Sequence, residues 1–154
     1  MRKHYWLGQL SMTHDREAAV GWAVRLGRQL LQDDHPVTVQ VDGCPHNAQA
    51  LLRDAEQSSD ARTILLLFAE FEAAIREVYR HHYRKTTAPD ADPLMESIAN
   101  RVLMAPDVLE AAHRARQARN DIIHSAASSP IDSLGARSSL ARFLSWLPDW
   151  TIST

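Results

Sequence analysis

Hydrophobic residues recur at helical spacing along most of the chain, and the clearest case spans residues 61–85. The apolar positions there are separated in turn by four and three residues, which places them on one face of a helix. Ser58, Ser59 and Asp60 precede this segment and can cap its first turn. Because such a face is stabilised by burial against other helices, the sequence predicts that this helix lies at the centre of a bundle. The face consists of Ile64, Phe68, Phe71, Ile75 and Val78.

Three further helices are expected after the long one. The pair Asp92-Pro93 combines a capping residue with a proline at the first helical position, and it opens a helix over about 92–104. The next helix spans about 107–127, and the last spans about 131–147. Short loops between consecutive helices favour antiparallel neighbours. We therefore expect a mainly α fold, an up-down bundle of four to five helices.

The first third of the chain mixes helical and strand patterns. Residues 1–12 are predicted to form a short strand, and Thr13 is predicted to cap a helix over about 13–32. The alternating valines of residues 37–41 predict a second strand, and a helix of about 46–57 follows it. The expected helix over 13–32 carries one apolar face, made of Ala19, Trp22, Ala23, Leu26 and Leu30.

These patterns divide the chain into three parts. We expect residues 1–57 to form a small N-terminal αβ elaboration, residues 58–148 to form the helical bundle, and residues 149–154 to form a tail. Cys44-Pro45-His46 is interpreted as a turn after the strand, because no second pair of metal ligands stands at a suitable spacing.

Composition and charge limit the classes of function. The chain has 154 residues, of which 45% are hydrophobic and 23% charged, as expected of one ordinary soluble domain. A formal net charge of -2 gives no basic excess for extended, non-specific binding to duplex DNA. A single cysteine excludes an intrachain disulfide, and no apolar run is long enough to span a membrane. We therefore expect a cytoplasmic protein without a membrane partner.

Arg119 is the most informative residue of the expected helix over 107–127. At about 100° per residue, Arg119 falls roughly 20° from the centre of the apolar face of this helix. A buried guanidinium is costly unless an anionic group meets it. The sequence leaves two anions open: a carboxylate of the protein, for which Glu72 is one candidate, or a bound phosphate.

Polar residues surround Arg119 on the same helix. Asn120 and His124 are four residues apart and therefore share a face. Arg116 lies about 60° from Arg119 around the helix, whereas Asp121 points away from the apolar face. Near the end of the long helix, His81 and His82 stand among basic residues, and these cations can either interact with the helix dipole or contact RNA.

The order of these elements resembles the higher eukaryotes and prokaryotes nucleotide-binding (HEPN) superfamily. The resemblance rests on a long helix with Phe-Ala-Glu-Phe-Glu at residues 68–72, a shorter helix, a helix that ends with Arg119-Asn120-x-x-x-His124, and a final helix. The signature of the family is an arginine, four to six residues, and a histidine. That spacing occurs at three other Arg/His pairs of this chain, so the helical context carries the resemblance, which covers about residues 58–148.

The resemblance implies a metal-independent endoribonuclease without a cofactor, which acts as a homodimer with two motif helices facing each other. It also implies a prokaryotic defence or toxin–antitoxin setting, with RNA as the substrate and an antitoxin protein as a possible partner. Histidine transfers protons near neutral pH, and arginine matches the geometry of phosphate.

The expected roles follow from this resemblance. His124 is the general acid or base, Arg119 clamps the phosphate, and Asn120 orients His124 or holds a phosphate oxygen. The candidates for further contacts with RNA are Arg116, Asp121, Arg76 and Arg80. Two other interpretations stay open: a non-catalytic module that binds RNA, a nucleotide or a protein, and a helical interaction protein in which Arg119 pairs with a carboxylate.

Overall fold

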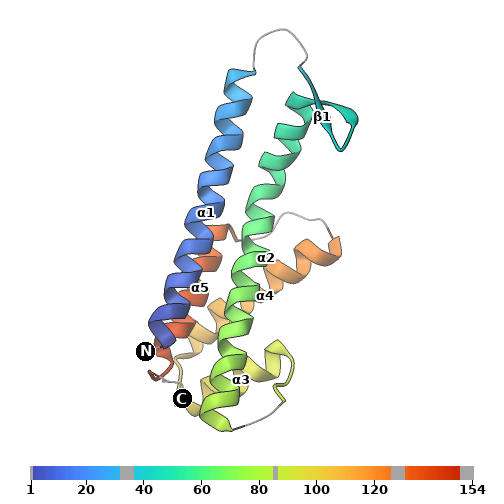
Figure 1. The fold of residues 1–154 in the computed structure, drawn as a ribbon. Coiled ribbons are helices and arrows are strands. Elements are labelled where there is room, and N and C mark those ends of the chain that lie inside the picture. The colour runs from blue at the N-terminus through green and yellow to red at the C-terminus, as the bar shows by residue number, and fades with distance from the viewer. Residues whose placement is uncertain (1, 32–36, 85–86, 126–130, 150–154) are drawn as a thin grey trace.

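The computed structural model describes residues 2–31, 37–84, 87–125 and 131–149 (Figure 1). Helices dominate the described residues, and a two-stranded hairpin lies between the first two of them. The prediction of a mainly α bundle with a small N-terminal αβ element is therefore confirmed. The elements are α1 (Arg2–Leu30), β1 (Thr38–Val41), β2 (Cys44–Asn47), α2 (Ala48–Tyr83), α3 (Ala91–Arg101), α4 (Pro106–Ser125) and α5 (Ser133–Trp146).

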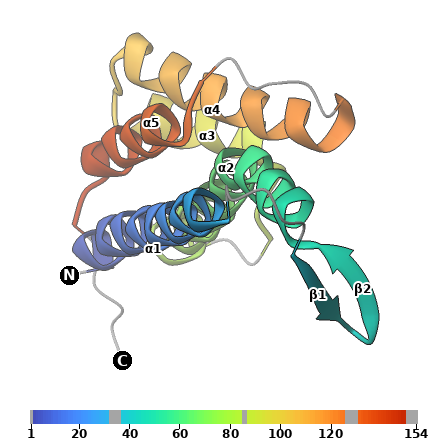
Figure 2. The same cartoon turned by 90° about the horizontal axis from the view of Figure 1, so that it is seen from above.

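Helix α2 lies at the centre of the bundle, between α1 on one side and α4 on the other (Figure 2). Its apolar face is buried as the spacing predicts, and Phe71 is fully enclosed. The ring of Phe71 meets the ring of Phe143 from α5 edge-on, with 5.2 Å between the centroids. Leu94 of α3, Val108 of α4 and Leu10 of α1 complete the same core. None of the described helices is both long and apolar enough to cross a membrane.

The N-terminal segment is helical, so the predicted strand over residues 1–12 and the predicted cap at Thr13 are wrong. Helix α1 begins at Arg2 and runs through Thr13 without interruption. Trp6 Nε1 donates a hydrogen bond to Glu77 Oε2 of α2 at 3.2 Å, and Leu10 is buried in the core. These tertiary contacts outweigh the strand preference of the aromatic residues, which is weak and depends on context.

Helix α2 is one continuous helix, although the sequence predicted two helices separated near Ser58-Ser59-Asp60. The polar side chains expected to cap a new helix bond elsewhere. Ser58 Oγ donates to the carbonyl of Ala55 at 3.3 Å, and Asp60 Oδ1 accepts from the backbone N–H of Ser133 at 3.1 Å. Asp60 therefore caps the start of α5 instead. The expected boundary between residues 57 and 58 lies inside α2.

The hairpin contains a strand that the sequence analysis interpreted as a turn. Cys44–Asn47 forms β2 and pairs antiparallel with β1, with Val41 opposite Cys44. Asp42 and Gly43 connect the strands with φ angles of 49° and 77°. Two consecutive residues with positive φ form the tight turn that Asp-Gly favours in hairpins.

The apolar face that the sequence placed on the first helix points away from the bundle. Its five residues are all exposed, and so is Met12 seven residues before Ala19. We call the six together the outer stripe: Met12, Ala19, Trp22, Ala23, Leu26 and Leu30. The opposite side of α1 faces α2 with a buried Glu17, held by Arg62, and with Gly21. A Cβ atom at Gly21 would lie 3.1 Å from Ser59 Oγ, so the absence of a side chain permits the close approach of the two helices.

Candidate functional site

Helix α4 holds the Arg-Asn-x-x-x-His motif against the core. Val108, Ala112 and Ala115 of its apolar face are fully buried, as their spacing predicts. Ile122 is partly buried and packs on the same core, whereas Ile123 is 48% exposed. The apolar face of α4 is therefore mostly covered by its own chain, and the site lies along the edge of this buried face.

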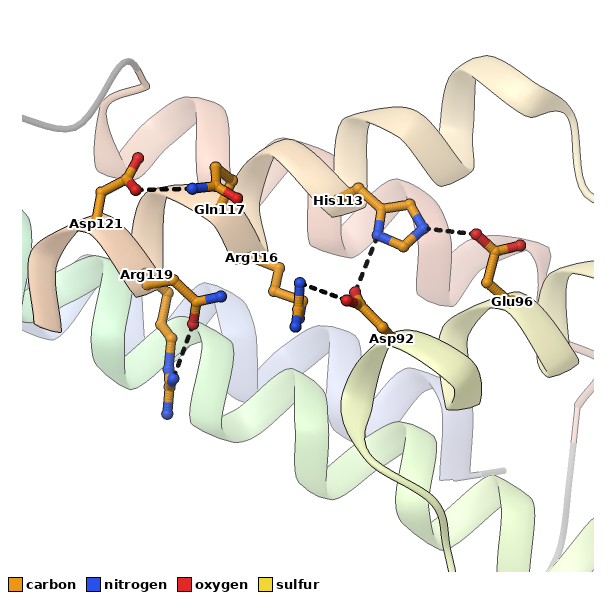
Figure 3. A network of polar contacts seen from close by, with 8 residues as sticks. Asp92, Glu96, His113, Arg116, Gln117, Arg119 and Asp121 are labelled. Atoms are coloured by element: carbon orange, nitrogen blue, oxygen red, sulfur yellow. Dashed lines mark hydrogen bonds and ion pairs between the residues drawn. The ribbon is translucent and has the colours of Figure 1, made fainter. Parts of the chain in front are cut away.

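Arg119 lies half-buried at the edge between α4 and α2. Its Nη1 donates a hydrogen bond to Asn120 Oδ1 at 2.9 Å, and its guanidinium carbon lies 6.0 Å from the centroid of the Phe68 ring. Figure 3 shows the side chain of Arg119 extending from α4 toward α2. Among the described residues, Arg119 forms no ion pair. The anion that the sequence required is therefore not supplied by a described carboxylate.

Glu72, the candidate carboxylate for Arg119, has another partner. Its Oε1 accepts hydrogen bonds from Arg76 Nη2 at 2.6 Å and from Arg76 Nε at 3.1 Å. The interpretation in which Glu72 neutralises Arg119 is therefore wrong. The same ion pair occupies Arg76, one of the residues expected to contact RNA.

Asn120 and His124 follow Arg119 toward the end of α4. His124 is exposed in the last turn, and Asn120 is half-buried one turn before it. Because the carbonyl oxygen of Asn120 accepts from Arg119, the amide nitrogen is left to donate to an incoming oxygen. The role of Asn120 in holding a phosphate oxygen or in orienting His124 stays a prediction.

Arg116 belongs to a polar network that joins α3 to α4 (Figure 3). Its Nη1 lies 2.6 Å from Asp92 Oδ2, and His113 Nδ1 lies 3.3 Å from Asp92 Oδ1. His113 Nε2 also lies 3.2 Å from Glu96 Oε1. The contact of Arg116 with RNA stays a prediction, and the guanidinium already has a carboxylate partner.

Sequence reasoning missed this network because it interpreted Asp92 as a helix cap. The structure places Asp90 at the N-cap of α3 and Asp92 in the first helical turn. The available signal was the spacing of His113 and Arg116, three residues apart and hence on one face of α4. Their common partner could not be identified before the placement of α3 was known.

The other expected RNA contacts are spread over the molecule. Asp121 Oδ1 accepts a hydrogen bond from Gln117 Nε2 at 2.7 Å, on the edge of α4 opposite Arg119 (Figure 3). Arg80 is exposed on α2. It follows Phe68 by twelve residues, which corresponds to about 18 Å along the helix axis. The structure thus brings Arg119 and Asn120 together, with His124 one turn further, and leaves Asp121 and Arg80 apart from them.

Two other polar regions lie away from the motif. A cavity of about 210 Å³ between α1 and α2 is lined by Glu17, Arg25, Glu56 and other residues. At the end of α2, burial raises the pKa of Tyr83, and Arg101, 4.3 Å from the ring centroid, opposes that shift. No group of three or more potential metal ligands occurs among the described residues.

No family model matches the chain, and neither the curated proteins nor the solved structures include a match. The candidate site is therefore defined by its own residues and geometry, on a mainly α bundle.

Proposed function

We propose that the protein is a metal-independent endoribonuclease of the HEPN type, with its site on α4. One observation supports this most strongly. A half-buried arginine is normally matched by an anionic group, yet among the described residues Arg119 meets only the amide of Asn120 and the face of Phe68. A phosphate of RNA would supply the missing negative charge, and exposed His124 follows Arg119 by five residues, about 7.5 Å along the helix axis.

Arg119 and Asn120 would bind the phosphate that is cut. The guanidinium offers donors in a fixed planar arrangement that suits two phosphate oxygens. Its hydrogen bond to Asn120 Oδ1 restrains it before RNA arrives, so less ordering is needed on binding. As charge develops on the phosphate oxygens during attack, these donors stabilise the transition state more than the ground state.

His124 would transfer the protons. A histidine takes the proton from the 2′-hydroxyl as the 2′-oxygen forms a bond to phosphorus. The bond between phosphorus and the 5′-oxygen breaks, and that oxygen receives a proton from a protonated histidine or from water. The products are a 2′,3′-cyclic phosphate and a 5′-hydroxyl end.

The resemblance also implies partners for this activity. They are a second copy facing the motif helix and, in a prokaryotic defence or toxin–antitoxin setting in the cytoplasm, an antitoxin protein. Alanines of the motif helix would favour such pairing if they were exposed. Ala112, Ala115 and Ala118 are instead buried in their own chain, so they do not offer an apolar surface to a second copy.

Cleavage of an RNA pool that includes transfer RNA, in excess EDTA, tests the proposal. We expect the wild type to cut RNA, and Arg119→Ala and His124→Ala to lose cleavage by at least about a hundred-fold, as when a general acid–base group is lost. Arg114→Ala is the matched control. Arg114 lies on the same helix but is exposed and pairs with Glu110, so its removal should leave cleavage unchanged.

Two results would contradict the proposal. Equal cleavage by His124→Ala and wild type would remove the proposed acid or base. RNA binding without cleavage by the wild type, lost in Arg119→Ala, would instead support the alternative of a non-catalytic module that binds RNA, a nucleotide or a protein through the same edge of α4.

A further inference from the structure

Helix α1 carries a large apolar surface that its own chain leaves exposed. In the outer stripe, Met12 is 62% exposed, Trp22 61% and Leu30 71%. The inner side of the same helix is the one that packs on the bundle, through Leu10 and the close approach at Gly21. A helix with a second apolar side, turned away from its own core, is typical of a helix that packs on another helix.

The spacing of the outer stripe matches helix-to-helix packing. Ala19, Ala23, Leu26 and Leu30 are separated by four, three and four residues, the interval that forms a continuous seam between two helices. Met12 continues the seam seven residues before Ala19, and Arg16 occupies the position between them. From Met12 to Leu30 the seam is about 27 Å long, at 1.5 Å per residue.

We propose that α1 pairs with α1 of a second copy in the antiparallel direction. The two-fold axis would pass between the two helices at the level of residue 21 along each helix. The stripe is complementary to itself in this arrangement. Ala19 of one copy faces Ala23 of the other on both sides of the axis, so small residues at the centre allow the helices to approach closely. Met12 faces Leu30 at each end, which places large apolar residues opposite each other.

Charge favours the antiparallel direction over the parallel one. A parallel pair would place Arg16 opposite Arg16 within the seam, and like charges at such a position are destabilising. The antiparallel pair places Arg16 opposite Leu26, where its aliphatic stem can cover the leucine while its charge reaches water. It also places exposed Asp15 of one copy opposite residue 27 of the other, between Arg25 and Gln29, so that a carboxylate lies near a guanidinium across the interface. Arg25 forms no ion pair among the described residues.

A second copy can reach this surface without blocking α4. The upper parts of α1 and α2 extend beyond α5 in Figure 1, and α4 lies on the other side of α2 in Figure 2. The pairing would therefore leave each Arg119 site open on the outside of the dimer. It is independent of the proposed cleavage of RNA.

The mass of the protein in solution tests the pairing. We expect the wild type to have the mass of two chains by light scattering at micromolar concentrations, and Leu26→Glu to have the mass of one. Ile123→Glu on α4 and Leu103→Glu after α3 replace other exposed apolar residues and should keep the mass of two chains. A wild type with the mass of one chain would overturn the proposal, as would dissociation of Ile123→Glu but not of Leu26→Glu. Circular dichroism checks that each variant is folded.

Disulfide crosslinking tests the direction. Cys44 is exposed, so the experiment uses a Cys44→Ser background. The double variant Ala19→Cys, Ala23→Cys should crosslink several-fold more efficiently than either single variant, because only the antiparallel pair places residue 19 opposite residue 23. Crosslinking of both single variants as efficiently as the double variant would overturn the antiparallel arrangement.

Discussion

Arg116 and Arg119 lie three residues apart on α4 but have different surroundings. Arg116 reaches Asp92 of α3, whereas the contacts of Arg119 with described residues are to an amide and an aromatic ring. The sequence could identify Arg119 as unusual because its position on the helix follows from the apolar spacing alone. The sequence could not show which group each arginine contacts, because those contacts depend on where α2 and α3 pack.

Replacing these two arginines should affect stability differently. Arg116→Ala should lower the free energy of unfolding by about 1–2 kcal/mol, between the values for exposed and buried ion pairs, because it leaves the partly buried Asp92 without its cation. Arg119→Ala leaves no described carboxylate without a partner and should cost less than Arg116→Ala. Urea denaturation measures both, and a larger loss for Arg119→Ala would mean that Arg119 has a structural role.

Tyr83 gives a prediction on pH. Its pKa is raised by burial above the ordinary value of 10.0. The folded state therefore favours the protonated phenol, so this contribution to stability is present below pH 10 and is lost as pH rises through the folded pKa. An ultraviolet absorbance titration, compared with Tyr83→Phe, should show one tyrosine that ionises late. In Arg101→Ala its pKa should rise further, and a fall would contradict the assigned role of Arg101.

Among the elements, those packed against the centre of the bundle were the most predictable. The predicted ranges of α3, α4 and α5 are close to the observed ones, and the predicted apolar face of α2 is buried, although α2 begins at Ala48 and not at residue 61. After Leu10, helix α1 has the reverse arrangement: small and polar residues such as Gly21 and Glu17 lie on its inner side, and the outer stripe is exposed. The spacing of the apolar residues therefore predicted the stripe, but it did not show that the stripe points away from the bundle.

Two carboxylates cap the start of α5. Asp132 Oδ1 accepts from the N–H of Gly135 at 2.7 Å, and Asp60 Oδ1 from the N–H of Ser133 at 3.1 Å. Asp132→Ala should lower the free energy of unfolding by about 1 kcal/mol, the usual cost of losing an N-cap. Asp132→Asn keeps an accepting oxygen and should lose less. Equal losses in the two variants would indicate that charge, and not the hydrogen bond, stabilises the helix start.

For the whole molecule, the fold class could be predicted because several helical segments share one strongly apolar partner, α2. The site could be predicted only in part, because α4 supplies the motif while α2 and α3 decide which cations remain unpaired. Arg116 pairs with Asp92 of α3, which no pattern of residues along α4 could show, whereas the pair of Arg76 with Glu72 has the four-residue spacing of neighbours on one helix.

The packing of Phe71 in the core should contribute strongly to the stability of the whole molecule. Phe71 is fully buried and contacts Phe143 edge-on, so it joins α2 to α5. Phe71→Ala should lower the free energy of unfolding by about 3–5 kcal/mol, the range for large-to-small changes in a core. Phe71→Leu keeps most of the volume and should cost less. Similar small losses for both variants, measured by urea denaturation, would show that this part of the core is loosely packed.

The most direct test of the central claim is cleavage of one RNA of defined sequence, compared with the same RNA carrying a single 2′-deoxynucleotide directly before the cut. If the 2′-hydroxyl is the attacking group, the wild type cuts the first RNA to a 2′,3′-cyclic phosphate in EDTA and leaves the second intact at that position. Equal cleavage of both RNAs would contradict the proposed chemistry of Arg119 and His124 on α4.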